Sequence, residues 1–468
     1  MPLWIEWFRC VRLLRVACTR TRSFLWMALA LLGLGARPDL AGVTSFVRAG
    51  YLGGFAYRRL LHFFHSEAVC LDVLVRAWVG LVLCLFQPLH VRGYLVAVAD
   101  GLKVGKEGRK MPAVKSLHQE STDNSKPAYI MGHSFQALGL LVRGPLSALF
   151  AVPLASRIHE GLVWSNRTTK TLLDKLVSLF LPIAEILGGK VILLVDAFYA
   201  SRKVILPLFK AGHEIVTRVR SNTVAYEPAP KPKEPKRGRP KFYDRKIRLR
   251  KVWKQIERFL AAPSPVYGEK DVEIRYLSMD LLWRPVGKLV RFVFVDHPTR
   301  GRMILMTTLL ALDPVEVIRL YGYRFKIEVS FKQALHTVGS YAYHFWMKAM
   351  TPIRRRSGDQ HLHMKTEEYR RQVRRKMRAY HLHVQLGCTA QGLLQHLAVN
   401  RKDSVWANFR SWMRTMRPAS APSEAVVAQA MRSSLPEFLF VCRKTDNIEK
   451  FLAEHADMDR IPGAKLAG

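Results

Sequence analysis

The chain has 468 residues, of which 49% are hydrophobic, so it can build one large core or two to three ordinary domains. Lysine and arginine number 74 against 36 aspartates and glutamates, a formal net charge of +38. Self-repulsion of this size opposes compact folding, so a polyanionic partner explains the charge better than solubility does. We expect nucleic acid as the partner and no membrane, because the basic residues run along the whole chain instead of forming one juxtamembrane cluster.

Two apolar runs near the start, residues 24–34 and 78–86, are shorter than the roughly 20 residues that a helix needs to cross a bilayer. We therefore predict that both are core helices. The six cysteines show neither paired spacing nor a C-x-x-C motif, so neither a zinc site nor a disulfide framework is expected. This cysteine usage is typical of a reducing cytoplasm.

Residues 1 to about 90 are predicted to be helical. Near the start, Trp4, Phe8 and Val11 recur at helical spacing, while arginines take the other faces. A basic helical region of this kind can be a DNA-reading module of helix-turn-helix type. A plain helical cap on the next domain explains the pattern equally well, and both interpretations stay open.

From residue 93 the pattern changes to strands. The apolar run YLVAVAD ends in Asp100 and is followed by a polar loop with Lys103 and Lys106. These two lysines are candidates for contacts with phosphates, and a merely solvated loop is the alternative. Further strands are predicted at residues 128–136, 138–142 and 148–154.

A helix at residues 168–187 is predicted next, and then the strand VILLV, which ends at Asp196. A helix at 202–210 and a strand at 214–219 follow. Strands followed by alternating helix and strand predict a mixed α/β sheet, and two strands of that sheet end in aspartate.

The stretch YEPAPKPKEPKRGRPK is rich in proline and lysine and predicts an extended, solvated linker. Its RGRP core has the form of an AT-hook, in which Arg237 and Arg239 would lie in a narrow A·T minor groove. A linker without DNA contacts is the alternative. Strand patterns resume after it, so residues 222 to about 300 are predicted to be a β insertion within the α/β domain.

Asp313 and Glu316 form a strong helix start, with Asp as the N-cap and Glu three residues later. Four polar residues then follow at i, i+3, i+7 and i+11: Tyr321, Arg324, Glu328 and Lys332. On one continuous helix this spacing places all four on one narrow face. An exposed helix with weak intrahelical ion pairs is the bland alternative.

Two strand-end aspartates and one helix-borne glutamate are the ligand set of a two-metal phosphoryl-transfer site. Hard Mg²⁺ or Mn²⁺ takes oxygen ligands, and three carboxylates can hold two such ions about 4 Å apart. We therefore predict that Asp100, Asp196 and Glu328 bind two divalent ions. The cations beside Glu328 would hold phosphates.

At these residues the sequence resembles bacterial insertion-sequence transposases of the DDE type. The most specific segments are AVADGLKVGKEGRKMP, LLVDAFYASRKVI and LYGYRFKIEVSFKQALHTVGSYAYHFW. The third is similar to the Tyr-Arg-Glu-Lys signature of the cut-and-paste group, and Tyr321, Arg324 and Glu328 match its spacing. The lysine of the signature falls at Leu335, so Lys332, one turn earlier, is the expected substitute.

The resemblance implies a ribonuclease H-like mixed-sheet catalytic core over residues 91–350, interrupted by the β insertion. It also implies a helical DNA-end-binding domain at 1–90 and a basic helical C-terminal region at 351–468. Asp100, Asp196 and Glu328 would cleave the element's ends and join the freed 3′-OH to target DNA, using two Mg²⁺ or Mn²⁺ ions.

The partners implied are the terminal inverted repeats and target DNA, held by a homodimer in the bacterial nucleoid. Trp253 and Trp283 are the candidates for an aromatic side chain that stacks on DNA. The expected DNA contacts are listed together: Tyr321, Arg324, Lys332, Lys103, Lys106, Arg237 and Arg239. The alternative function is a catalytically inactive DNA-binding relative or a regulator of transposition.

Overall fold

A computed structural model describes residues 2–119, 127–145, 148–230, 241–266, 268–412, 419–441 and 446–462. Packing divides the chain into two units. Unit 1 consists of Met1–Gln87, Gly101–Thr169 and Glu328–Gly468, and unit 2 of Pro88–Asp100 and Lys170–Ile327. The chain therefore passes between units directly after Asp100 and directly before Glu328.

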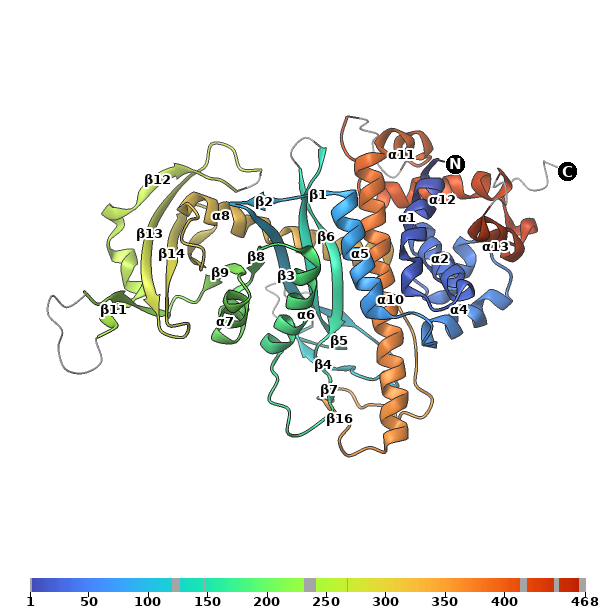
Figure 1. The fold of residues 1–468 in the computed structure, drawn as a ribbon, viewed down its shortest axis with the longest axis horizontal. Helices are drawn as coiled ribbons and strands as arrows, with labels where there is room; N and C mark the ends of the chain where they lie inside the picture. The colour runs from blue at the N-terminus through green and yellow to red at the C-terminus, as the bar shows by residue number, and fades with distance from the viewer. Residues whose placement is uncertain are drawn as a thin grey trace. The chain divides into compact units, whose positions relative to one another are not determined.

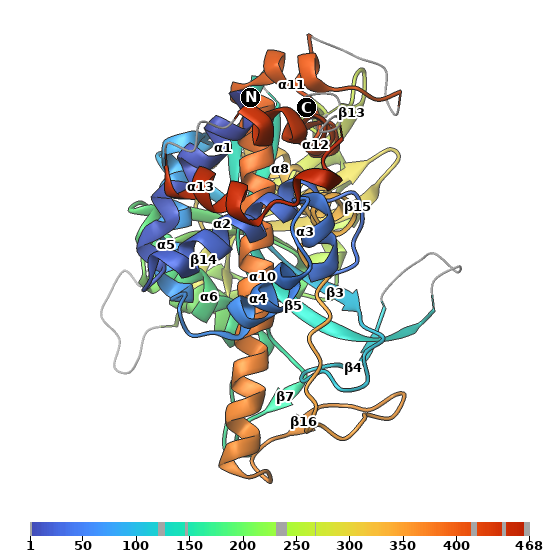
Figure 2. The ribbon, with the colours of Figure 1, turned by 90° about the vertical axis from the view of Figure 1, so that its right-hand side faces the viewer.

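The helices of unit 1 begin at the N-terminus, as predicted. They are α1 (Pro2–Arg12), η1 (Leu13–Ala17), α2 (Thr21–Ala36), α3 (Val43–Ala49), α4 (Phe55–His65) and α5 (Leu71–Leu85). The later helices are α9 (Lys326–Gln333), the π-helical turn η6 (Ala334–Val338), α10 (Glu367–Asn400), α11 (Lys402–Asn408), α12 (Glu424–Val441), α13 (Asn447–His455) and η7 (Met458–Arg460). The 34-residue α10, orange in Figure 1, packs against α2, α4, α5 and α12. Figure 2 shows α10 passing behind the N-terminal helices.

The two apolar runs lie in core helices, as predicted. Residues 24–34 fall in α2, which is apolar on nearly all faces and is buried along most of its length. Residues 78–86 lie mostly in α5, whose Trp78 is fully buried. Within the described part of the chain, no helix is both long and apolar enough to cross a membrane.

The strands of unit 1 form antiparallel pairs around β5. They are β4 (Lys115–His118), β5 (Tyr129–Arg143) and β6 (Leu149–Ile158), with β5 pairing both neighbours. Short strands β7 (Leu162–Val163) and β16 (Gln360–His361) pair in parallel. The prediction of two strands at 128–136 and 138–142 is wrong, because β5 runs through Ala137 without a turn. The pairing of β5 with β6 shifts register between Leu138 and Gly139, and the strand continues through this point.

The strands of unit 2 form a mixed sheet. Parallel pairing joins β3 (Tyr94–Gly105), β8 (Val191–Val195) and β9 (Glu214–Val219). Antiparallel pairing continues in the order β9, β15 (Gly301–Thr307), β14 (Lys288–His297), β13 (Glu273–Trp283), β10 (Val224–Pro228) and β11 (Tyr243–Arg248). Smaller strands complete the list: β1 (Gln87–Pro88), β2 (His90–Val91) and β12 (Leu260–Pro263). The predicted α/β class is confirmed.

Local signals explain the elements around β8. All five residues of β8 are buried, as in strands covered on both faces. Helix α6 (Leu172–Leu187) begins after Thr171, which forms a capping box with Asp174, and ends at Gly188 in a left-handed conformation. Helix α7 (Arg202–Lys210) has the predicted bounds and packs on β9.

The strands predicted within residues 222–300 are present as β10 to β14. The short helices η4 (Leu249–Lys254) and η5 (Ile256–Arg258) connect these strands. Arg237 and Arg239 lie outside the described residues, so their predicted contacts with the minor groove stay a prediction.

The predicted continuous helix after Asp313 is wrong. Helix α8 (Pro314–Tyr323) starts with the predicted capping box but ends before a turn at Arg324 and Phe325, and α9 begins at Lys326. The four polar residues are therefore divided: Tyr321 lies in α8, Arg324 in the turn, and Glu328 and Lys332 in α9. Gly322 and the neighbouring Tyr321, Tyr323 and Phe325 are weak helix formers, which favours an interruption here.

Candidate active site

Asp100 and Asp196 lie at matching positions on neighbouring parallel strands of unit 2. Val98 of β3 is paired with Leu194 of β8, and each aspartate follows its member of that pair by two residues. Neighbouring strands are about 4.8 Å apart. Asp196 starts the short helix η3 (Ala197–Tyr199), and its Oδ1 accepts a hydrogen bond of 2.6 Å from the Ala197 backbone N–H. The sheet therefore presents two half-buried carboxylates at one place.

Arg324 forms an ion pair with Asp100. Its Nη1 lies 3.0 Å from Oδ2 of Asp100, and both side chains are mostly buried. Arg324 lies in the turn between α8 and α9, with φ of −50° and ψ of −36°. Arg324 thus binds one of the two strand-end carboxylates.

Tyr321 completes the group in unit 2. The guanidinium carbon of Arg324 lies 5.8 Å from the centre of its ring. Burial raises the pKa of the Tyr321 hydroxyl, Asp196 acts in the same direction, and Arg324 and Arg218 oppose them. The hydroxyl is therefore protonated at neutral pH and can donate a hydrogen bond. Arg218, which is exposed in β9, is a further cation beside this group that the sequence pattern does not indicate.

Glu328 lies near the start of α9, in unit 1, and is half-buried. Two residues later, Ser330 accepts hydrogen bonds of 3.0 Å at its backbone oxygen and at Oγ from the Gln391 side chain of α10. This contact ties α9 to the longest helix of the unit. Lys332 is exposed. The approach of Glu328 to the two aspartates stays a prediction, as does a phosphate contact of Lys332.

The two lysines after Asp100 differ in their exposure to solvent. Lys103 is exposed, and its Nζ donates to the backbone oxygen of His118 at 2.7 Å. Lys106 is only 8% exposed and donates to the backbone oxygens of Tyr341 and Tyr343. Burial lowers its pKa to about 7. The two backbone carbonyls hold the Lys106 side chain in the interior. The prediction that Lys106 lies in a solvated loop is therefore wrong, and so is the prediction that it contacts phosphates at the surface.

The two tryptophans predicted to stack on DNA, Trp253 and Trp283, are packed against other residues of the insertion or buried in it. Trp283 is only 6% exposed, so the prediction that it stacks on DNA is wrong. Trp253 stacks on Phe259 at 5.5 Å, and its edge meets Phe294 at 5.6 Å. An exposed aromatic that sequence analysis missed is Phe198, which is 50% exposed and lies two residues after Asp196.

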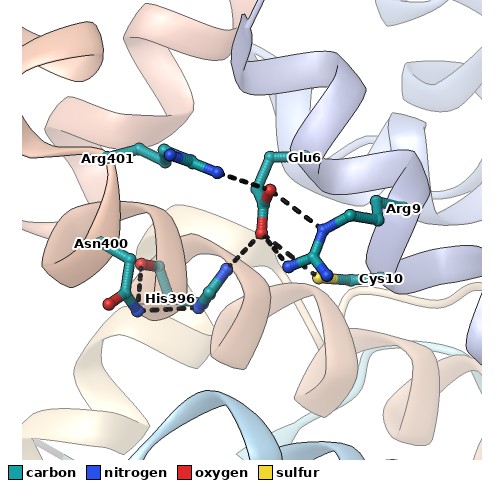
Figure 3. Close-up of polar contacts among 6 residues, drawn as sticks. All are labelled: Glu6, Arg9, Cys10, His396, Asn400 and Arg401. Atoms are coloured by element: carbon teal, nitrogen blue, oxygen red, sulfur yellow. Dashed lines mark hydrogen bonds and ion pairs between the residues drawn. The ribbon is translucent and has the colours of Figure 1, made fainter.

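A second group of metal-ligand residues lies elsewhere, in unit 1. Glu6, Cys10 and His396 bring ligand atoms within 4.8 Å of one another, and Figure 3 shows them with two arginines. Arg9 and Arg401 both bind the Glu6 carboxylate, at 2.6 and 2.9 Å. Burial raises the pKa of the Cys10 thiol to about 11. Two guanidinium groups and a protonated thiol disfavour a cation, so this group is a buried ion-pair network.

Comparison with known families agrees with the fold. Residues 147–340 match the family model described as a transposase DDE domain. The match contains Asp196, Tyr321, Arg324 and Glu328 and begins after Asp100. The chain therefore contains a segment that is similar to a transposase DDE domain. Its mixed sheet with a β-rich insertion and flanking helices is consistent with the predicted ribonuclease H-like core. No curated protein matches the sequence.

Proposed function

We propose that this protein cleaves the ends of its insertion element and joins them to target DNA by two-metal phosphoryl transfer. The observation that carries the proposal is the placement of Asp100 and Asp196 at matching positions on neighbouring parallel strands. The match to a transposase DDE domain supports the reaction class. Glu328 is the proposed third carboxylate.

The residues fit a pair of hard divalent ions. Carboxylates are the preferred ligands of Mg²⁺ and Mn²⁺, and each offers two oxygens with about four lone-pair sites. Asp196 accepts a hydrogen bond from the Ala197 N–H at Oδ1, and Asp100 pairs with Arg324 through Oδ2. Asp100, Asp196 and Glu328 would hold the ions, which when bound activate the attacking oxygen and stabilise the leaving oxygen.

Other residues of the chain are proposed to bind and orient DNA. The protonated Tyr321 hydroxyl can donate to a phosphate oxygen, and the Arg324 guanidinium can bind phosphate in a bidentate way. Exposed Lys103 and Lys332 add positive charge on the surface. The net charge of +38 predicts that affinity for DNA falls steeply as salt rises. Contacts of residues 1–90 with the terminal repeats, and a homodimer that holds two ends, belong to the same proposal.

The test is cleavage of linear DNA that carries the element's own terminal repeats, with Mg²⁺ or Mn²⁺. We expect Glu328→Gln and Asp196→Asn to lose cleavage by at least about 100-fold while they still bind the repeats. The matched control is Asp296→Asn, which alters a carboxylate paired with Arg302 in the insertion. Binding without cleavage in all four proteins, wild type included, would contradict the proposal and support the inactive relative or regulator.

A further inference from the structure

An irregular segment follows the helix that carries Glu328. Residues 339–345 come directly after η6, have no helix or strand, and are largely buried. Buried backbone oxygens outside regular structure need donors from elsewhere, because an unpaired carbonyl in the interior is costly. The donors to this segment therefore show what fixes its position.

Four buried side chains of unit 1 supply these donors. Each binds one or two backbone oxygens of the segment from Val338 to Phe345. Arg37 donates to Val338 and Gly339, His383 contacts Ser340 at 3.0 Å, Lys106 donates to Tyr341 and Tyr343, and the Tyr380 hydroxyl donates to Phe345 at 2.7 Å. The segment is thus held at six backbone oxygens, and two of the four donors are cations.

Arg37 makes the most contacts of the four. Its Nε lies 2.9 Å from the Val338 oxygen, and its Nη2 lies 2.5 Å from the oxygens of both Val338 and Gly339. Nη1 donates to Ser45 Oγ at 3.2 Å, and the guanidinium lies over the Phe46 ring at 5.0 Å. Each of the three guanidinium nitrogens therefore donates at least one hydrogen bond.

Arg37 is unusual in being a buried cation held by carbonyl oxygens. It is 2% exposed, and within the described ranges it forms no ion pair with a carboxylate. Burial lowers its pKa to about 9. A buried charge without an acidic partner is costly, so its contacts with the segment must offset that cost.

Gly339 permits this contact. Its φ of +66° is in the left-handed region, and a Cβ placed on it would lie 2.1 Å from Nη2 of Arg37. Only glycine allows the guanidinium to approach the backbone so closely at this turn. The helical segment from α9 to η6 therefore ends at a glycine turn that leaves room for the Arg37 guanidinium.

The two oxygens that Arg37 binds lie at the C-terminal end of the helical segment that carries Glu328. A cation at a helix C-terminus satisfies the last carbonyls and favours the helix dipole. Gln391 holds the same segment near its start, through Ser330. We infer that Arg37 is a positioning residue for Glu328, which it orients by fixing the end of that segment; this rests on the proposed function.

The contact also has a consequence for how the chain is connected. Arg37 follows α2, within the N-terminal helices that are proposed to bind the DNA ends. The same guanidinium therefore joins that region to the segment that carries the proposed metal ligand. We expect a displacement of the turn after α2 to move the end of the segment that carries Glu328.

The experiment compares full-length Arg37→Lys with a matched control, Arg157→Lys. Lysine keeps the charge but cannot bind several oxygens as a planar fork. Arg157 is another cation of unit 1 with a lowered pKa, and its guanidinium donates to Ser156 and Gln385 instead. Two quantities are measured: amide hydrogen exchange of residues 326–338, and the Mn²⁺ concentration that gives half-maximal cleavage of terminal-repeat DNA.

We expect Arg37→Lys to speed exchange in this segment about tenfold and to raise the half-maximal Mn²⁺ concentration by a similar factor. Arg157→Lys should leave both at wild-type values. If Arg37→Lys does not fold, Ser45→Ala removes one hydrogen bond of the same guanidinium and should shift both quantities in the same direction by a smaller factor.

Two results would overturn the inference. One is unchanged exchange in Arg37→Lys, and the other is faster exchange with an unchanged Mn²⁺ requirement, which marks a purely structural contact. Glu328→Gln separates this from failure of the proposed function. If the wild type does not cut, or Glu328→Gln cuts as well as the wild type, the proposed function fails and the positioning role fails with it.

Discussion

Nη1 of Arg324 lies 3.0 Å from Oδ2 of Asp100, so a carboxylate that is proposed to bind metal also pairs with a guanidinium group. The guanidinium and a divalent ion compete for the same oxygens. Positive charge near a site also weakens the binding of another cation by direct repulsion. This relationship makes the affinity for metal depend on Arg324.

Arg324→Met should therefore bind Mn²⁺ about three- to tenfold more tightly in the absence of DNA. Cleavage at saturating Mn²⁺ should nevertheless fall, because the variant loses a phosphate-binding side chain. Calorimetric titration with Mn²⁺ measures the first effect. Arg302→Met is the matched control, since Arg302 pairs with Asp296 in the insertion at 3.3 Å. Weaker binding of Mn²⁺ in Arg324→Met would contradict the assignment of Asp100.

Tyr321→Phe removes the hydroxyl and keeps the ring. We expect cleavage to fall about tenfold, the typical loss for one hydrogen bond to a charged group, while stability changes by less than about 1 kcal/mol. Because the pKa of Tyr321 is raised, its titration should not limit the rate below about pH 10. Rates of single-turnover cleavage from pH 6 to pH 9 test both points. A wild-type rate in Tyr321→Phe would exclude a role for the hydroxyl.

The Glu6 network predicts a dependence of stability on pH. Arg9 lowers the pKa of Glu6 most, and His396 and Arg401 add to this against the effect of burial. The carboxylate therefore stabilises the fold fully above its ordinary pKa of 4.5, and this contribution is lost as pH falls further. Glu6→Gln should cost about 3 kcal/mol at pH 7 and progressively less below pH 4.5.

Urea unfolding at pH 7 and at pH 3.5 measures that difference. Glu368→Gln is a suitable control, because Glu368 is an exposed acid in unit 1. A cost for Glu6→Gln that stays constant between the two pH values would mean that the charge of Glu6 does not stabilise the fold.

The cap of α8 can be tested by itself. Asp313 Oδ1 accepts a hydrogen bond of 2.8 Å from the Val315 N–H. Glu316 Oε2 accepts a hydrogen bond of 3.2 Å from the Asp313 N–H. Asp313→Ala should lower the free energy of unfolding by about 1 kcal/mol, while Asp313→Ser keeps a capping oxygen and should cost less. Denaturant titration compares the two. Equal losses would show that the cap is not the source of the effect.

Local chemistry explains what the sequence could predict. The apolar run of β8, the cap at Asp313 and the helix over residues 202–210 depend on neighbours in the chain, and the structure has all three. The aspartates after β3 and β8 were found for the same reason. Parallel strands in register then bring two such positions together.

Contacts between distant residues explain what the sequence could not predict. Arg324 pairs with Asp100, which is 224 positions away, and no local pattern predicts that pair. Lys106 is buried because its partners are carbonyls more than 200 positions away. Arg37 precedes a proline in a short connection, a pattern typical of an exposed loop, and nothing near it in the sequence indicates that Gly339 receives it.

The pairing of β8 with β3, and of β6 with β5, has a practical consequence. Both partner strands lie before residue 147, where the match to the DDE domain begins. A polypeptide limited to residues 147–340 would leave β8, whose five residues are all apolar and buried, without a neighbour on one side. Such an uncovered strand is a template for pairing with another chain. Expression of that piece alone should therefore yield aggregates, and the boundary of family similarity is not a boundary of folding.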